Sequence, residues 1–166
     1  MVDPDDLVTQ YGADTVRLFI LFAAPPETEL EWDDRGIEGA SRFLNRIWRI
    51  QDNLKEKADP QLLRILHKTI KKVSGDIEGF KFNTAIASLM ELVNAIYQMG
   101  ADKEALSKLL ILLSPIAPHF AEELWQKLGN AESIAKTKWP EYDPGLLIEE
   151  NIAIVIQING KLRSNI

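Results

Sequence analysis

Cysteine is absent from this 166-residue sequence, and histidine occurs only twice. Without cysteine the chain has no disulfide bond, no thiolate metal site and no cysteine nucleophile. Long apolar runs are also absent, so no segment has the length of a transmembrane helix. The most apolar short run, at residues 18–24, follows four aspartates, whereas a secretory signal needs a basic flank. The sequence therefore predicts a cytoplasmic protein that does not enter a membrane.

Positive charge is also in short supply. Acidic residues number 25 against 19 lysines and arginines, which gives a formal net charge of −6. This balance argues against a protein that binds nucleic acid through its overall charge, but it does not exclude a local basic patch. The hydrophobic content of 46% and the charged content of 27% are those of a globular domain that can bury a core.

Residues that could form a catalytic or metal site are few. No phosphate-binding loop of the Gly-x-x-x-x-Gly-Lys type occurs. His119, Glu122 and Glu123 have a helical spacing that could bind a metal, but no second histidine lies near them. Ser114 and His119 could act as nucleophile and base, but no third residue orients them. The sequence therefore predicts no catalytic residue and no metal ligand, and a free-standing enzyme would require a metal at His119.

Start and stop signals divide most of the chain into helices. Aspartate followed by proline typically caps and opens a helix, and glycine typically ends one. We expect helices at residues 3–12, 14–22, 33–57, 60–77, 83–99, 102–113 and 119–128. Residues 14–22 are apolar nearly all round and should be largely buried, and Tyr97 should face the core. Short connections favour antiparallel neighbours, so the predicted fold is all-α, an up-and-down helical bundle.

The last residues of the chain have a different pattern. Residues 152–158 are rich in β-branched side chains and are typical of a strand. Asn159-Gly160 is a strong signal for a two-residue hairpin turn, and a returning strand would begin at Lys161. A lone hairpin is only marginally stable in water. We therefore expect a short C-terminal β-hairpin that is cut inside a further domain.

The predicted helix at residues 33–57 has two contrasting faces. One is apolar, and the opposite one carries Arg35, Arg42, Arg46 and Arg49 along about 20 Å. Arginine forks match phosphate oxygens, so this row could follow a nucleic-acid backbone. Trp48 and Asn45 flank the row and could add stacking or polar contacts. The alternative is a solvated face with intrahelical pairs such as Glu38 with Arg42, and the residues alone favour it because charged helix faces are common.

Four stretches of the sequence together resemble one protein family. They are Val2–Pro4 with Tyr11–Phe19; Phe22–Pro26 and Leu30–Trp32 with Gly36–Ala40 and Arg42–Trp48; Leu113–Trp125; and Ile156–Arg163. Over essentially all its residues the chain resembles the segment of bacterial-type leucyl-tRNA synthetases that follows their Lys-Met-Ser-Lys-Ser motif. The third stretch is similar to the signature of the anticodon-binding helical domain in this subclass of synthetases.

The resemblance implies three parts. They are a connecting segment after the catalytic core at residues 1–32, the anticodon-binding helical bundle at 33–130, and a linker with the truncated start of the C-terminal domain at 131–166. The bundle would bind leucine tRNA along its body more than at its anticodon bases. Arg42 and Arg46 match family positions that face the tRNA. The expected tRNA-binding residues are these two with their helix neighbours Arg49, Trp48 and Asn45, whereas Arg35 stays undecided.

The reaction implied by the resemblance is the ATP-dependent joining of leucine to its tRNA, with ATP and magnesium used by the full-length enzyme. The family's His-Ile-Gly-His and Lys-Met-Ser-Lys-Ser motifs and its editing domain are missing, so this chain alone should be inactive and hold no cofactor. The implied partners are leucine tRNA and the catalytic and C-terminal domains of the same enzyme, which is expected to be a monomer. The alternative is a structural or protein-interaction bundle without direct RNA contact.

Overall fold

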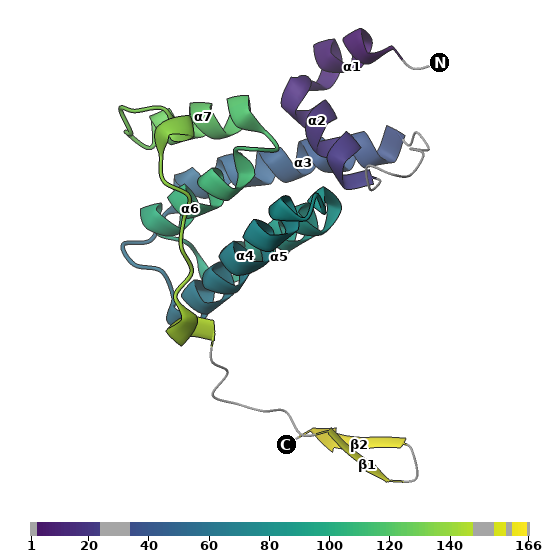
Figure 1. Ribbon diagram of the computed structural model, residues 1–166, viewed down its shortest axis with the longest axis vertical. Helices are drawn as coiled ribbons and strands as arrows, with labels where there is room; N and C mark the ends of the chain where they lie inside the picture. Colours follow the sequence, from purple (N-terminus) through teal and green to yellow (C-terminus); the bar gives the residue numbers. More distant parts are fainter. Residues whose placement is uncertain (1–2, 24–33, 148–154, 159–160, 166) are drawn as a thin grey trace.

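The computed structural model describes residues 3–23, 34–147, 155–158 and 161–165, and seven α-helices occupy most of this part (Figure 1). They are α1 (Pro4–Tyr11), α2 (Ala13–Ala23), α3 (Asp34–Ile50), α4 (Pro60–Glu78), α5 (Phe82–Met99), α6 (Lys103–Leu113) and α7 (Pro118–Lys127). Helix α4 packs along α5, α6 packs against α7, and α5 also packs against α2 and α3. The predicted helical bundle is confirmed. No helix in the described ranges is both long enough and apolar enough to span a membrane.

Aspartate and glycine residues set the ends of several helices, as their positions in the sequence predict. The carboxylates of Asp3, Asp59 and Asp102 cap α1, α4 and α6, each accepting the N–H of a residue two or three positions further on, at 2.9, 2.7 and 2.8 Å. Gly12 and Gly100 close α1 and α5 with φ angles of +84° and +79°. Glycine adopts such angles without a Cβ clash, so these positions stop the two helices sharply.

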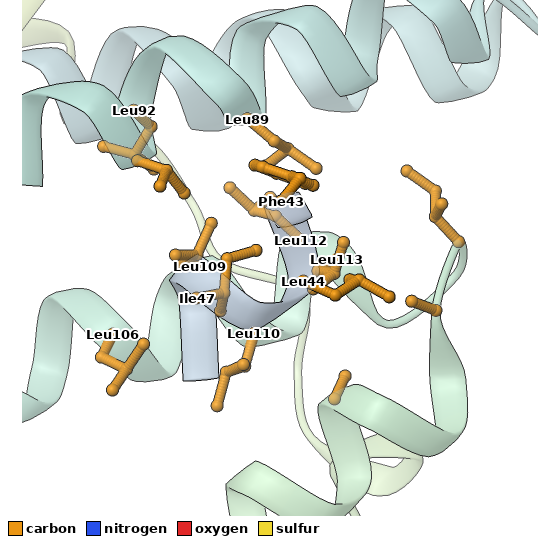
Figure 2. Close-up of a cluster of buried hydrophobic side chains, with 14 of the residues drawn as sticks. Phe43, Leu44, Ile47, Leu89, Leu92, Leu106, Leu109, Leu110, Leu112 and Leu113 are labelled. Carbon is orange, nitrogen blue, oxygen red and sulfur yellow. The ribbon is translucent and has the colours of Figure 1, made fainter. Parts of the chain in front are cut away.

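The core is rich in leucine and is centred on α6. Figure 2 shows apolar side chains of α3 and α5 gathered around the leucines of this helix. The labelled residues are each at most 5% exposed: Phe43, Leu44, Ile47, Leu89, Leu92, Leu106, Leu109, Leu110, Leu112 and Leu113. Burying a side chain of this kind contributes about 1.5–3 kcal/mol, so this contact fixes which face of α3 points to solvent.

The helix predicted at residues 33–57 ends earlier than expected. Helix α3 stops at Ile50, a 3-10 turn follows at Gln51–Asn53 (η1), and Leu54 has an extended backbone with ψ of 137°. The N–H of Lys55 then donates to the carbonyl of Ala101 at 2.9 Å, so the chain leaves the helix axis to join the α5–α6 connection. Leu54 still packs against the core. The position of Leu54 therefore continues the apolar stripe of the predicted helix, although the backbone of Leu54 is extended.

Two predictions of burial are wrong. Tyr97 is 50% exposed, because it lies at the edge of α5 that faces α3, where its hydroxyl donates to the carbonyl oxygen of Arg46 at 2.9 Å. In α2 the first half is buried, but Ile20 and Phe22 in the second half are 48% and 40% exposed. The described neighbours therefore do not cover all of the apolar surface of this helix.

Polar contacts join α2 to the start of α7, and we call this region the α2–α7 junction. The N-cap residue of α7 is Ala117, which has no side chain that could cap the helix. The buried carboxylate of Asp14 replaces it, accepting the Phe120 N–H at 2.6 Å. Arg17 donates through Nε to the carbonyl of Ile116 at 3.2 Å. Two of the stretches that carried the family resemblance therefore meet at this junction.

A segment at residues 139–147, here called the strap, runs from α7 back along α4. It includes the 3-10 turn η3 (Pro144–Leu147), and another such turn, η2 (Ile134–Lys136), precedes it. Trp139 Nε1 donates to Ser74 Oγ at 2.8 Å, and the Asp143 N–H donates to Nδ1 of the buried His67 at 2.8 Å. These contacts fasten the chain to α4 before the last residues.

Two strands follow the strap, β1 (Val155–Ile158) and β2 (Lys161–Asn165). They pair in antiparallel register, with Val155 opposite Asn165 and Ile158 opposite Lys161, and the register shifts between Ile156 and Gln157. The predicted turn at residues 159–160 lies outside the described residues, so the hairpin itself stays a prediction.

Candidate nucleic-acid interface

The outer face of α3 carries Arg42, Arg46 and Arg49, since its opposite face is held in the core. Residues 39–51 include these three arginines and no acidic residue, in a chain that is acidic overall. The side chain of Arg42 is 69% exposed, and its Nη1 lies 3.5 Å from Glu38 Oε2. Such an exposed pair contributes little to stability and is readily exchanged for a phosphate.

Arg46 is held by α5 on two sides. Its Nη2 donates to Asn94 Oδ1 at 2.8 Å, and its guanidinium lies 4.7 Å from the centre of the Tyr97 ring. The Tyr97 hydroxyl also bonds the Arg46 carbonyl, so the two helices are joined through both backbone and side chain. A guanidinium fixed in this way loses less rotational freedom when it binds an oxyanion. The guanidinium of Arg46 is therefore already held in position before a ligand binds.

The remaining predicted residues lie at different parts of α3. Arg49 is exposed and borders a hollow with Tyr97 and Lys55 at the end of α5. Asn45 is exposed, and its Nδ2 donates to the Ser41 carbonyl at 2.9 Å. Trp48 turns toward α7, where its ring centre lies 5.8 Å from that of Phe120 and 5.4 Å from Lys127 Nζ. The structure thus brings Arg42, Arg46 and Arg49 together beside α5 and places Trp48 on the α7 side.

Two residues of this face were missed by the sequence reading. Tyr97 was assigned to the core, and Asn94 was not considered. Both lie one turn apart on α5, at the edge where Arg46 meets them. A polar residue and a tyrosine at spacing three would be a signal for such an edge, because a tyrosine hydroxyl needs a polar partner.

The residues considered for a metal site have other partners. His119 is 82% exposed with its Nδ1 3.0 Å from Asp14 Oδ1, and Glu123 pairs with Lys127. Glu122 accepts hydrogen bonds from Gln126, Ser133 and the Ile134 N–H, and the first two lower its pKa most. Within the described residues no group of three or more possible ligands is close enough to hold a metal ion.

The structure is an α-helical bundle, and its helix α3 presents three arginines on its outer face, where they could contact a phosphate backbone. Residues 59–166 match the family model described as the anticodon-binding domain of tRNA ligase. This match covers more than half of the chain, and the chain belongs to that family.

Relatives with curated names agree with this family. The chain is 45% identical over 188 residues to a leucine–tRNA ligase of Pseudothermotoga lettingae and 49% identical over 193 residues to one of Syntrophobacter fumaroxidans. A leucine–tRNA ligase of Geobacter sp. strain M21 is 47% identical over 191 residues. Each match covers all of this chain, and the chain spans 23% of each relative.

A solved structure extends the similarity to the fold. The LeuRS (agnB2) of Agrobacterium radiobacter K84, crystallised as a ternary complex with tRNA and LeuAMS, superposes with a TM-score of 0.85 at 33% identity. The match covers 99% of this chain and 24% of that chain. The resemblance to leucyl-tRNA synthetases found in the sequence is confirmed.

Proposed function

We propose that this chain is the tRNA-binding helical domain of a leucine–tRNA ligase, a class I aminoacyl-tRNA synthetase. The observation that carries the proposal is the arginine row of α3, with Arg46 held by Asn94 and Tyr97, in a chain whose whole length matches leucine–tRNA ligases. The domain orients leucine tRNA while a catalytic domain outside these residues joins leucine to it. The similar LeuRS–tRNA complex supports tRNA as the partner.

The contribution of the arginines is positional. Contacts to phosphates fix the register and orientation of a nucleic acid, and they make its affinity dependent on salt. Arg46 offers a pre-ordered fork, and the exposed Arg42 and Arg49 extend the row along the helix. Asn45 and Trp48 belong to the proposal as flanking residues of the same helix. ATP and magnesium would be used for leucine activation in the catalytic domain of the full-length enzyme.

The proposal includes the division of the chain. Residues 1–32 connect to the catalytic core, residues 33–130 form the binding bundle, and residues 131–166 lead into a C-terminal domain that starts with a β-hairpin. The strap contacts at His67 and Ser74 hold residues 139–147 of the last part against α4 of the bundle. The parent enzyme is proposed to act in the cytoplasm as a monomer.

The test uses the full-length ligase that contains this chain. Arg42→Ala with Arg46→Ala should weaken leucine-tRNA binding by about tenfold or more, since each removes a charged hydrogen bond to phosphate. Leucine-dependent ATP–pyrophosphate exchange should stay unchanged, because it does not need tRNA. Lys136→Ala with Lys138→Ala is the control, as it removes the same charge from exposed lysines after α7. Equal loss of both activities, or unchanged tRNA binding, would favour a purely structural bundle.

A further inference from the structure

Helix α2 contacts the bundle in two ways that differ in chemistry. One side of the helix is apolar: Val16, Leu18 and Phe19 are buried, and α2 packs against α3 and α5. Apolar burial is favourable but not directional, so this side favours contact more than any one angle between the helices. The polar contacts of the α2–α7 junction add the directional restraint.

Two charged residues on neighbouring turns of α2 make these polar contacts. Asp14 Oδ2 accepts the Phe120 N–H at 2.6 Å, and its Oδ1 lies 3.0 Å from His119 Nδ1. One turn further along α2, Arg17 donates through Nε to the carbonyl of Ile116 at 3.2 Å. Hydrogen bonds weaken steeply when their distance or angle changes. Because the contacts are spread over one turn of α2, they resist both sliding and rotation of this helix.

The carboxylate that caps α7 comes from a distant part of the chain. Helices α1, α4 and α6 are each capped by the aspartate that directly precedes them. At α7 the N-cap residue is Ala117, and the accepting carboxylate belongs to Asp14, 106 positions from Phe120. A serine or aspartate at position 117 would cap α7 without any reference to α2. The observed arrangement instead ties the start of α7 to the position of α2, which capping alone does not require.

The angle of α2 acts over the whole length of the bundle. Helices α1 and α2 lie at the N-terminal end of the molecule, and the last turn of the strap lies at the other end (Figure 1). Helix α4 alone has 19 residues and is therefore about 28 Å long. A tilt of about 10° at α2 would move the far end of such a helix by about 5 Å. Since a misplacement on the order of 1 Å can cost about 100-fold in rate, a small change at the junction would matter for catalysis.

We propose that Asp14 and Arg17 are positioning residues for aminoacylation, because they set the angle between the binding bundle and the preceding part of the ligase. Leucine tRNA held by the bundle then presents the end that receives leucine to the catalytic domain. This inference rests on the proposed tRNA-binding function and adds where the orientation of the bundle is determined. Asp14 is 7% exposed and Arg17 is bonded to the Ile116 carbonyl, so both residues act through the backbone of the α6–α7 connection and of α7.

A purely structural role of the junction predicts a different result. Loss of stability would lower tRNA binding and leucine transfer together, whereas loss of the correct angle lowers transfer alone. Asp102 is the matched control for Asp14, since its carboxylate also caps a helix and also accepts a second N–H. It accepts those of Ala105 at 2.8 Å and Ala58 at 3.0 Å, and it joins parts of the bundle only.

The first test measures three quantities in the full-length ligase. Asp14→Ala and Arg17→Gln should each lower the single-turnover rate of leucine transfer to saturating tRNA by about tenfold. The Kd for leucine tRNA and leucine-dependent ATP–pyrophosphate exchange should both stay within about twofold. Asp14→Asn keeps an oxygen for the Phe120 N–H and should recover part of the rate, and Asp102→Ala should transfer leucine at the normal rate. Arg17 is exposed, so Arg17→Gln keeps the test valid if Asp14→Ala does not fold.

The second test measures the orientation of the bundle itself in the full-length ligase. Energy transfer is recorded between a fluorophore on Lys136→Cys, at an exposed position after α7, and a fluorescent leucyl-adenylate analogue in the catalytic domain. The distance should shift or its distribution should broaden in Asp14→Ala and Arg17→Gln, but not in Asp102→Ala. An unchanged distance or an unchanged transfer rate in both junction variants overturns the proposal, as does an equal loss of rate in Asp102→Ala. If Arg42→Ala with Arg46→Ala leaves tRNA binding unchanged, the proposed function itself fails.

Discussion

The α2–α7 junction and the outer face of α3, which carries Arg42 and Arg46, use charged residues in opposite ways. At the junction Asp14 is 7% exposed, and both of its carboxylate oxygens contact α7, one of them the Phe120 N–H. On the face Arg42 is mostly exposed and forms a long ion pair with Glu38, at 3.5 Å. Buried charges with fixed partners hold an architecture together, whereas exposed charges with exchangeable partners are available for a ligand. Mutations should therefore lower stability at the junction and ligand affinity on the face.

The largest effect on stability is expected at the junction. Asp14→Ala should lower the free energy of unfolding by about 3 kcal/mol, because hydrogen bonds to charged groups contribute about 1.5–3 kcal/mol and a carboxylate also suits a helix N-terminus. Urea unfolding of this chain followed by circular dichroism measures the loss. Asp14→Asn keeps one oxygen that can accept the Phe120 N–H and should lose less. If Asp14→Ala lowered the free energy of unfolding by less than about 1 kcal/mol, the junction would not differ from the α3 face in its contribution to stability.

A smaller effect is expected where α2 meets α3. A Cβ added to Gly36 would lie 2.5 Å from the ring of Phe19, so Gly36→Ala should lower stability by about 1–2 kcal/mol despite its better helix propensity. Gly39 is the matched control, since its Cβ would meet only the end of the Arg42 side chain, at 3.8 Å. Gly39→Ala should raise stability by up to about 1 kcal/mol. The Tm should therefore fall for Gly36→Ala and rise for Gly39→Ala when thermal unfolding is measured.

The strap gives an intermediate case that depends on pH. Burial lowers the pKa of His67 most, and the positive charge of Lys108 lowers it further, while Asp143 and Glu104 act in the opposite direction. Because the folded pKa is lower than the unfolded value near 6.5, the neutral histidine contributes stability above that pH and loses it as the pH falls. The free energy of unfolding should therefore be lower at pH 5.0 than at pH 7.5. His67→Gln can still accept the Asp143 N–H and should show a smaller loss between the two pH values.

Local signals in the sequence were sufficient to predict most of the helices, but not the contacts between the helices. Asp3, Asp59, Asp102 and Gly100 act within four residues of their own position, so their capping roles could be read directly. Asp14 has an equally plain cap-like position, yet its carboxylate contacts a helix 106 positions further on. Such a partner is selected by how the helices pack, which spacing rules do not describe. The early end of α3 was missed for the same reason, since Lys55 bonds Ala101.

The candidate site was predictable only on one helix. Arg42, Arg46 and Arg49 share a face by spacing alone, and burial of Phe43, Leu44 and Ile47 puts that face in solvent. The partners of Arg46 on α5 could not be found, because a single helix pattern does not say which helix lies beside it.

The smallest effect on stability is expected from Arg42. Its substitution therefore separates a loss of tRNA affinity from a loss of stability most clearly. Arg42→Ala removes one exposed ion pair and should change the free energy of unfolding by no more than about 0.5 kcal/mol. Arg46→Ala also removes the bond to Asn94 and the contact with Tyr97, so it should lower stability by about 1–2 kcal/mol. In the full-length ligase both variants should weaken tRNA binding. Unfolding and filter-binding titrations on the two single variants separate these quantities. If the loss of affinity followed the loss of stability, and Arg42→Ala bound tRNA normally, the arginines would serve the fold and not the ligand.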